Sequence, residues 1–282
     1  MALSVNTNPG AFVALQALSS TNNSLTTTQN RVSTGLEIAG VEDSSSGFII
    51  AQNIRTDISG LDSLQFSLDN AAGALDVAIS AGETVSNLLI EAREIALAAT
   101  DNGLAADSRA ALEDDYQAIL SQIDAVVASA EFNGVNAVNT TATEAITAVI
   151  NLAGGFAGDT FAGNNITVDG VDLTVSGGTL NITFSGLGSV NSAQSALTEI
   201  DAASSALNTV LAGFGAASTQ IELQQEFFSN LQDTLTVGVG NIVDADLAVE
   251  SANLQALQVQ QQLGLTALSI ANAAPSAVLA LF

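Results

Sequence analysis

The sequence predicts a mainly α-helical protein, in which long antiparallel helices from both termini form coiled-coil or bundle layers. Apolar residues recur at helical spacing through both halves of the chain, and only 2 of its 282 residues are Pro. One stretch, from about residue 140 to 190, is instead rich in Gly, Thr and Asn. We expect this stretch to form a small β-hairpin insert. Because terminal helices of matching character usually pack as neighbours, the insert should lie at the tip of the bundle far from both termini.

The first predicted helix begins at Asn8, whose side chain suits an N-cap, with Pro9 in the first helical position. Two polar residues, Asn22 and Gln29, interrupt its apolar pattern; they either fix the register of a coiled coil or are simply solvated. The heptad consists of Ala11, Leu15, Leu18, Asn22, Leu25, Gln29, Val32 and Leu36.

A loop follows between Gly40 and Gly47. Gly35 and Gly47 have two equally good interpretations: they end helices, or they allow close helix approach at a bend. A long helical pattern then runs from about Ile54 to Ala99, and Asp101-Asn102-Gly103 breaks it.

A third helix spans about Leu112 to Ala130 and is followed by an Asn133-Gly134 turn. In the insert, residues 166–175 alternate around Asp169-Gly170, which predicts a hairpin. Leu180, Ile182 and Phe184 suggest one more strand.

Helical spacing returns from Leu197 to Leu235, after which Gly238-Val239-Gly240 suggests a hinge. We expect Asp244 and Asp246 to cap a last helix that Pro275 ends. Its apolar spacing is carried by Leu247, Leu254, Leu257, Gln261 and Leu268.

Both ends of the chain are uncharged, although the formal net charge is -25. Residues 1–30 and 251–282 contain no Asp, Glu, Lys or Arg. Burying a charge is costly, whereas an amide or hydroxyl is tolerated if it finds a hydrogen bond. We therefore expect the ends to be buried against each other and against other copies, as in a polymer subunit. The alternative is a monomeric bundle, but its surface helices normally carry a charged outer face.

The composition also excludes several functions. With 29 acidic residues and 4 Arg, the chain should repel nucleic acid and acidic membranes. His and Cys are absent and no phosphate-binding loop is present, so we expect no enzyme, cofactor or metal site. Glu113, Asp114 and Asp115 fit a solvated helix face better than a cation site.

Membrane insertion and signal-dependent secretion are also not expected. The apolar stretch from Leu263 to Phe282 is broken by polar residues, which favours an amphipathic helix over a membrane span. The first residues show neither a basic region nor an apolar run, so we expect no Sec signal peptide.

Several blocks, in order, resemble bacterial flagellin, most closely the alphaproteobacterial type. The resemblance covers roughly residues 1–139 and 190–282, and together the blocks are highly specific. They are Arg31-Val32-Ser33-Thr34-Gly35-Leu36, Asp43-Ser44-Ser45-Ser46-Gly47, Phe132-Asn133-Gly134-Val135, Asn241-Ile242-Val243-Asp244-Ala245-Asp246-Leu247, Ala267-Leu268-Ser269-Ile270-Ala271-Asn272 and the terminal Val278-Leu279-Ala280-Leu281-Phe282.

The resemblance implies a layered, extracellular flagellar filament. Residues 1–40 and 243–282 would form its inner coiled-coil layer, residues 41–139 and 190–242 the second layer, and residues 140–189 a short variable insert. The residues expected to pack the inner layer are Leu15, Leu18, Leu25, Val32, Leu254, Leu257 and Leu268.

The implied partners are other copies of the chain, an export chaperone, the flagellar type III export apparatus, the filament cap and hook-associated proteins. In the family, an innate immune receptor contacts a helical segment with two Arg flanking one apolar residue. Here that stretch is Leu89-Ile90-Glu91-Ala92-Arg93-Glu94-Ile95, and Glu91 replaces the first Arg, which predicts poor recognition. The alternatives to a filament subunit are a hook–filament junction protein and a secreted acidic helical adhesin or binding module.

Overall fold

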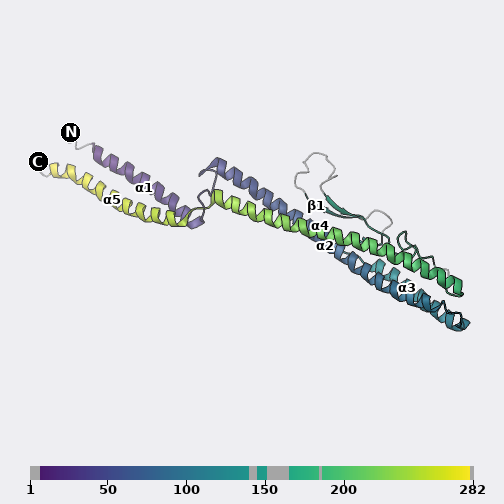
Figure 1. Ribbon diagram of the computed structural model, residues 1–282. Helices are drawn as coiled ribbons and strands as arrows, with labels where there is room; N and C mark the ends of the chain where they lie inside the picture. The colour runs from purple at the N-terminus through teal and green to yellow at the C-terminus, as the bar shows by residue number, and fades with distance from the viewer. Residues whose placement is uncertain (1–6, 140–144, 151–164, 184–185, 280–282) are drawn as a thin grey trace. The chain divides into compact units, whose positions relative to one another are not determined.

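The computed structural model describes residues 7–139, 145–150, 165–183 and 186–279, with side chains placed as far as residue 273 (Figure 1). The predicted mainly α-helical fold is confirmed. The elements are α1 (Pro9–Thr34), α2 (Ser45–Ala98), α3 (Ala106–Ser129), β1 (Ile146–Val149), β2 (Asn165–Val168), α4 (Val190–Val243) and α5 (Leu247–Leu279). The chain divides into two compact units, one of residues 1–58 and 233–282 and the other of residues 59–232.

In the first unit, α1 and α5 lie side by side and antiparallel (Figure 1, purple and yellow). Helix α1 starts as the sequence predicts, because the Asn8 side chain accepts a hydrogen bond from the backbone N–H of Ala11 at 3.2 Å and Pro9 follows. It ends at Gly35, whose φ of 74° lies in the left-handed region that favours glycine. For Gly35, helix termination is therefore the correct one of the two interpretations.

The linker that precedes α2 hydrogen-bonds to the last residue of α4 and to the linker that precedes α5. The backbone N–H of Glu37 donates to the carbonyl of Val243 at 2.7 Å, and that of Ala245 donates to the carbonyl of Gly35 at 2.9 Å. The side chain of Asp246 then caps α5 by accepting hydrogen bonds from the backbone N–H groups of Ala248 and Val249. The predicted cap at Asp246 is thus confirmed.

The predicted hinge at residues 238–240 is wrong, because α4 continues to Val243. Val239 and Val243 lie one turn apart on α4 and are buried together with Ala51 of α2. Two glycines cost a helix only about 1 kcal/mol each, and this buried contact outweighs that cost. The chain instead leaves the helical conformation at residues 244–246.

Gly47 follows the second interpretation, close approach. A Cβ atom at this position would lie 2.6 Å from Cδ1 of Ile38, so a larger residue would displace the Ile38 side chain from the first turn of α2. The hydroxyl of Ser44 accepts a hydrogen bond from the backbone N–H of Gly47 at 3.3 Å and caps this turn.

The second unit packs parts of α2 and α4 antiparallel, with α3 beside them (Figure 1). Two amide–carboxylate hydrogen bonds show the register, since Gln225 donates to Asp69 at 2.8 Å and Gln232 donates to Asp62 at 2.7 Å. These residues are seven apart on each helix, the spacing of a heptad. The interior is rich in alanine, including Ala71, Ala74, Ala78, Ala81, Ala92, Ala96, Ala196 and Ala203.

The insert lies in this unit, but its hairpin is not the predicted one. Strand β2 pairs antiparallel with β1, with Ile146 opposite Val168. Residues 171–173 hydrogen-bond to the backbone of Ala137 and Val138, so they cannot pair across Asp169-Gly170. In contrast, the predicted turn at Asn133-Gly134 is confirmed, with both residues at positive φ.

The additional strand expected at Leu180 and Ile182 is also absent from the described residues, and Phe184 lies outside them. Leu180 and Ile182 are buried within an irregular segment. Three carboxylates hold the residues around this segment by accepting backbone hydrogen bonds: Asp124 from Val175, Glu199 from Thr183, and Glu113 from Leu187. Glu113 is therefore half-buried and hydrogen-bonded, whereas Asp114 and Asp115 are exposed, as expected of a solvated helix face.

Helix α5 does not end at Pro275, because its helical backbone continues to Leu279. A proline removes one hydrogen bond from a helix but does not necessarily stop it. None of the helices described here combines the length and the apolar character that crossing a bilayer requires.

Tyr116 provides a test of packing in the second unit. It is 1 % exposed, and its burial, followed by the negative charge of Glu199, raises the pKa of Tyr116 to about 12. It is also the one Tyr in a chain without Lys, His or Cys, so its titration is isolated from that of other side chains.

We predict that the second unit loses stability as pH rises from about 10 to about 12, because the unfolded chain ionises Tyr116 first. The contribution is full below pH 10 and amounts to roughly 2–3 kcal/mol. Absorbance at 295 nm should follow the ionisation, and circular dichroism at 222 nm the unfolding. Tyr116→Phe should remove this pH dependence; tyrosine ionisation near pH 10 in the folded chain would contradict the burial.

Candidate polymerisation surface on the terminal helices

The contact between α1 and α5 is a heptad seam on both helices. Buried or half-buried residues follow one another at steps of three and four, as in a coiled coil. On α1 the seam consists of Ala11, Ala14, Leu18, Thr21, Leu25, Thr28 and Val32, and on α5 of Glu250, Leu254, Leu257, Gln261, Gly264, Leu268 and Ala271.

Six of the seven residues expected to pack the inner layer lie in this seam, and Leu15 does not. Leu15 is 53 % exposed, because the α1 seam uses Ala14, Thr21 and Thr28 where the sequence pattern suggested the next residue in each case. Leu15 is apolar, whereas the residues that pack in the seam at these three positions are small or carry a hydroxyl group. The apolar pattern therefore predicted the wrong residue at each of them.

A polar pair within the coiled coil crosses from one helix to the other. The side chain of Gln261 donates to Asn22 Oδ1 at 2.7 Å, which supports the interpretation of Asn22 as a register-setting residue. Gln29 is exposed, as expected of a solvated position. Close approach occurs nearby, where a Cβ on Gly264 would lie 3.2 Å from Leu18 Cδ1.

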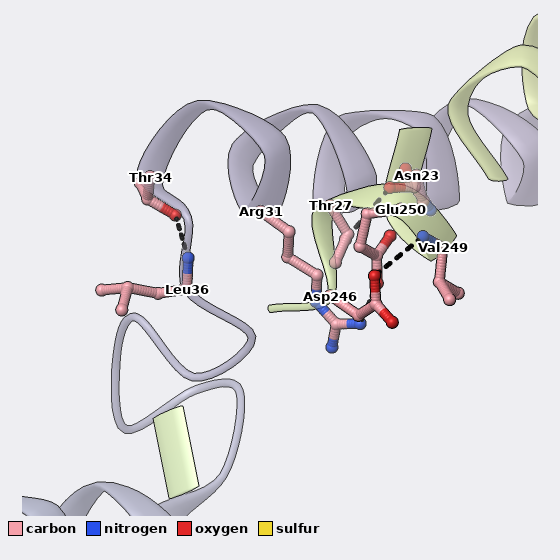
Figure 2. Close-up of polar contacts among 8 residues, drawn as sticks. All are labelled: Asn23, Thr27, Arg31, Thr34, Leu36, Asp246, Val249 and Glu250. Carbon is pink, nitrogen blue, oxygen red and sulfur yellow. Dashed lines mark hydrogen bonds and ion pairs between the residues drawn. The ribbon is translucent and has the colours of Figure 1, made fainter. Parts of the chain in front are cut away.

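An ion pair closes the linker end of the same pair of helices (Figure 2). Arg31 is the one charged residue among the first 36, and Glu250 is the one charged residue from Leu247 to the C-terminal Phe282. Arg31 Nη1 lies 3.0 Å from Glu250 Oε1, and the Glu250 side chain is only 11 % exposed. Sequence analysis missed this contact, although two lone charges of opposite sign at the borders of neutral segments were a usable signal.

The outward faces of α1 and α5 remain apolar and uncharged. Ile270 is 72 % exposed and Phe12 66 %. Large apolar side chains exposed in this number along two paired helices suit contact with other chains. The exposed large apolar residues are Phe12, Val13 and Leu15 on α1, and Leu247, Val249, Val259, Leu263, Leu265 and Ile270 on α5; we call them the outer apolar set.

The receptor-like segment on α2, residues 89–95, is only partly exposed. Leu89 is fully buried, whereas Glu91 and Glu94 are exposed. Arg93 Nε donates to Asp201 Oδ1 of α4 at 2.7 Å, and this hydrogen bond and the charge of Asp201 raise the pKa of Arg93 above its usual value. Of the four residues predicted for this segment, Leu89 is thus buried, Arg93 is paired with Asp201, and Glu91 and Glu94 are exposed.

In the described part of the chain, no group of three or more His, Cys, Asp or Glu side chains is arranged to hold a metal ion. The features that stand out are instead the uncharged paired helices and their outer apolar set, which suit association with other chains.

Two family models cover most of the sequence. Residues 5–143 match the bacterial flagellin N-terminal helical region, and residues 197–282 match the bacterial flagellin C-terminal helical region. The chain belongs to the bacterial flagellin family. The models leave residues 1–4 and 144–196 unmatched, and the second range includes both strands and most of the insert.

Similar proteins agree with this assignment over the full length. The chain is 39% identical to flagellin FljK of Caulobacter vibrioides, over 99% of this chain and 98% of that one. It is 35% identical to a flagellin of Brucella melitensis over 99% of both chains. A solved structure, a putative flagellar hook-associated protein from Vibrio parahaemolyticus, shares the fold with a TM-score of 0.58 and 16% identity, covering 72% of this chain and 100% of that one.

This flagellin is accordingly a structural protein that self-assembles into the flagellar filament outside the cell. The prediction of a filament subunit is confirmed over the alternatives of a junction protein or an adhesin, because the full-length relatives are flagellins. The similarity to the hook-associated protein concerns the fold alone.

Proposed function

We propose that this flagellin polymerises through its paired terminal helices, which line the filament as its inner layer. In this proposal residues 1–40 and 243–282 form the inner layer, residues 41–139 and 190–242 the second layer, and residues 140–189 an insert. The chain performs no catalysis and needs no cofactor. The observation that carries the proposal is the outer apolar set on two helices whose charged residues are Arg31 and Glu250, which pair with each other.

The energetics favour burial of these faces between subunits. Removing a large apolar side chain from water stabilises by about 1.5–3 kcal/mol, so several such residues per subunit supply a substantial driving force. No charge has to be desolvated along α1 before Arg31 or along α5 after Glu250. The polar Gln and Asn side chains of these helices can exchange water for hydrogen bonds to neighbouring subunits.

Membership of the flagellin family also supports a proposal for how the chain reaches the filament. We propose export of the unfolded chain through the flagellar type III apparatus, with an export chaperone holding it beforehand. Its further partners are the filament cap and the hook-associated proteins. These partners come from membership of the flagellin family and not from a described contact of this chain.

We predict that Leu263→Ala weakens polymerisation without destabilising the monomer. Leu263 is 61 % exposed in the single chain, so its truncation removes burial that exists only between subunits. The critical concentration for filament growth should rise at least tenfold, since the loss of about 1.5 kcal/mol or more corresponds to that factor. Light scattering gives the critical concentration and thermal unfolding the stability of the monomer.

Two matched variants on the same helix complete this test. Gln262→Ala, at the exposed neighbouring position, controls for the change in helix propensity and should leave the critical concentration within about twofold. Leu257→Ala, in the seam, should lower the stability of the α1–α5 pair as well as polymerisation. Normal polymerisation of Leu263→Ala would contradict the assignment of the outer apolar set as a subunit interface.

We also propose that the innate immune receptor for flagellin responds weakly to this protein. A reversed charge at Glu91 opposes a receptor surface that accepts Arg in the family, and Asp201 already engages Arg93. We predict that Glu91→Arg raises the potency of purified monomer on receptor-bearing cells at least tenfold. Glu83→Arg, the same charge change at another exposed position of α2, is the control. Wild-type potency equal to that of an enterobacterial flagellin would refute the proposal.

A further inference from the structure

Pro275 leaves a carbonyl of α5 without its helical partner. In an α-helix the N–H of each residue donates to the carbonyl four residues earlier, and proline has no N–H. The backbone of α5 remains helical from Leu247 to Leu279, so the missing donor is the one that would serve Ala271. A half-buried carbonyl in this position needs a donor from elsewhere.

The donor comes from the other end of the chain. Asn8 Nδ2 donates to the carbonyl oxygen of Ala271 at 2.7 Å, across 263 residues of sequence. The same side chain accepts a hydrogen bond from the backbone N–H of Ala11 through Oδ1, which caps α1. One amide thus serves both helices at once.

Among the good capping residues, only asparagine can do both. Ser, Thr and Asp accept the hydrogen bond of a cap about as well as Asn, but a carboxylate has no proton to donate and a hydroxyl is shorter. The first turn of α1 is close to α5 here, since a Cβ on Gly10 would lie 3.9 Å from Cβ of Ala271. The requirement at this position is therefore more specific than helix capping.

The contact also selects one axial register. Sliding one helix past the other by a single turn moves it about 5.4 Å, which carries the Asn8 amide beyond hydrogen-bonding distance of Ala271. Every other carbonyl nearby in the interior of α5 keeps its own helical donor. A misregistered pair would leave the Ala271 carbonyl unsatisfied, and a buried carbonyl without a partner is unfavourable.

We propose that Asn8 and Pro275 are a matched pair that sets the register of α1 against α5, which makes Asn8 a positioning residue for polymerisation. The proline creates a vacant acceptor at one defined place, and the N-cap of the partner helix fills it. The polymerisation part of this inference rests on the proposed function of the paired helices.

A double-mutant cycle in the full chain tests the pair. Asn8→Ser keeps a neutral N-cap but removes the amide donor, and Pro275→Ala gives the Ala271 carbonyl an N–H from its own helix. We expect Asn8→Ser to raise the critical concentration about five- to tenfold with Pro275 present, and by less than twofold in the Pro275→Ala background. Asn23→Ser, an exposed asparagine on α1, should behave alike in both backgrounds.

Hydrogen exchange of the α1 amides in the same four proteins separates the pairing of α1 with α5 from its role in polymerisation. Protection of residues 9–20 should fall in Asn8→Ser and recover when Pro275→Ala is added. An equal effect of Asn8→Ser in both backgrounds, by exchange and by critical concentration, would overturn the matched pair. Coupling seen by exchange but absent from the critical concentration would overturn the role in polymerisation and leave the pairing intact.

Discussion

The antiparallel contact between α1 and α5 is the constraint on which the functional surface depends. Each helix is uncharged over most of its length and apolar on more than one face. A single such helix would expose its seam and its outer apolar set together. Pairing buries the seam and leaves the outer apolar set exposed, so the contact decides which residues a neighbouring subunit can meet.

The structure places specific contacts along this seam because apolar packing alone tolerates sliding. Leucines at heptad spacing can fit one another in several registers, whereas polar contacts fit in one. Three such contacts join residues of α1 beside the seam, or of its N-cap, to seam residues of α5: Asn8 to Ala271, Asn22 to Gln261, and Arg31 to Glu250. The ion pair lies where the neutral segments end, so the charges cost little solvation at the surface that polymerises.

The sequence was sufficient for the fold class, the cap at Asn8 and the family, because these depend on local chemistry and periodicity. It was insufficient where a local conformational preference was outweighed by a contact with residues distant in the sequence. Gly238 and Gly240 suggested a hinge, but burial of Val239 and Val243 against Ala51 keeps α4 helical. The turn-forming pair Asp169-Gly170 was overridden because the following residues hydrogen-bond to Ala137 and Val138.

On the paired helices, too, local patterns were predictable from the sequence and distant contacts were not. The leucines of the seam were predictable from spacing, except that Leu15 faces outward because its small neighbour Ala14 packs inward. Pro275 suggested the end of a helix, because the donor that replaces its missing N–H is Asn8, which lies 263 residues from the acceptor Ala271 in sequence. No pattern within a single sequence links Asn8 to Pro275.

Disulfide trapping tests the central contact most directly, because the chain contains no Cys. A Cβ on Gly264 would lie 3.8 Å from Cβ of Leu18, which is the usual separation across a disulfide. We predict that the chain with Leu18→Cys and Gly264→Cys forms an intrachain disulfide, both as monomer and within filaments, and migrates as a monomer under non-reducing conditions. With Leu15→Cys and Gly264→Cys, no intrachain bond should form. Disulfide-linked dimers from the first pair, without an intrachain bond, would show that α1 and α5 pair between subunits and would contradict the account.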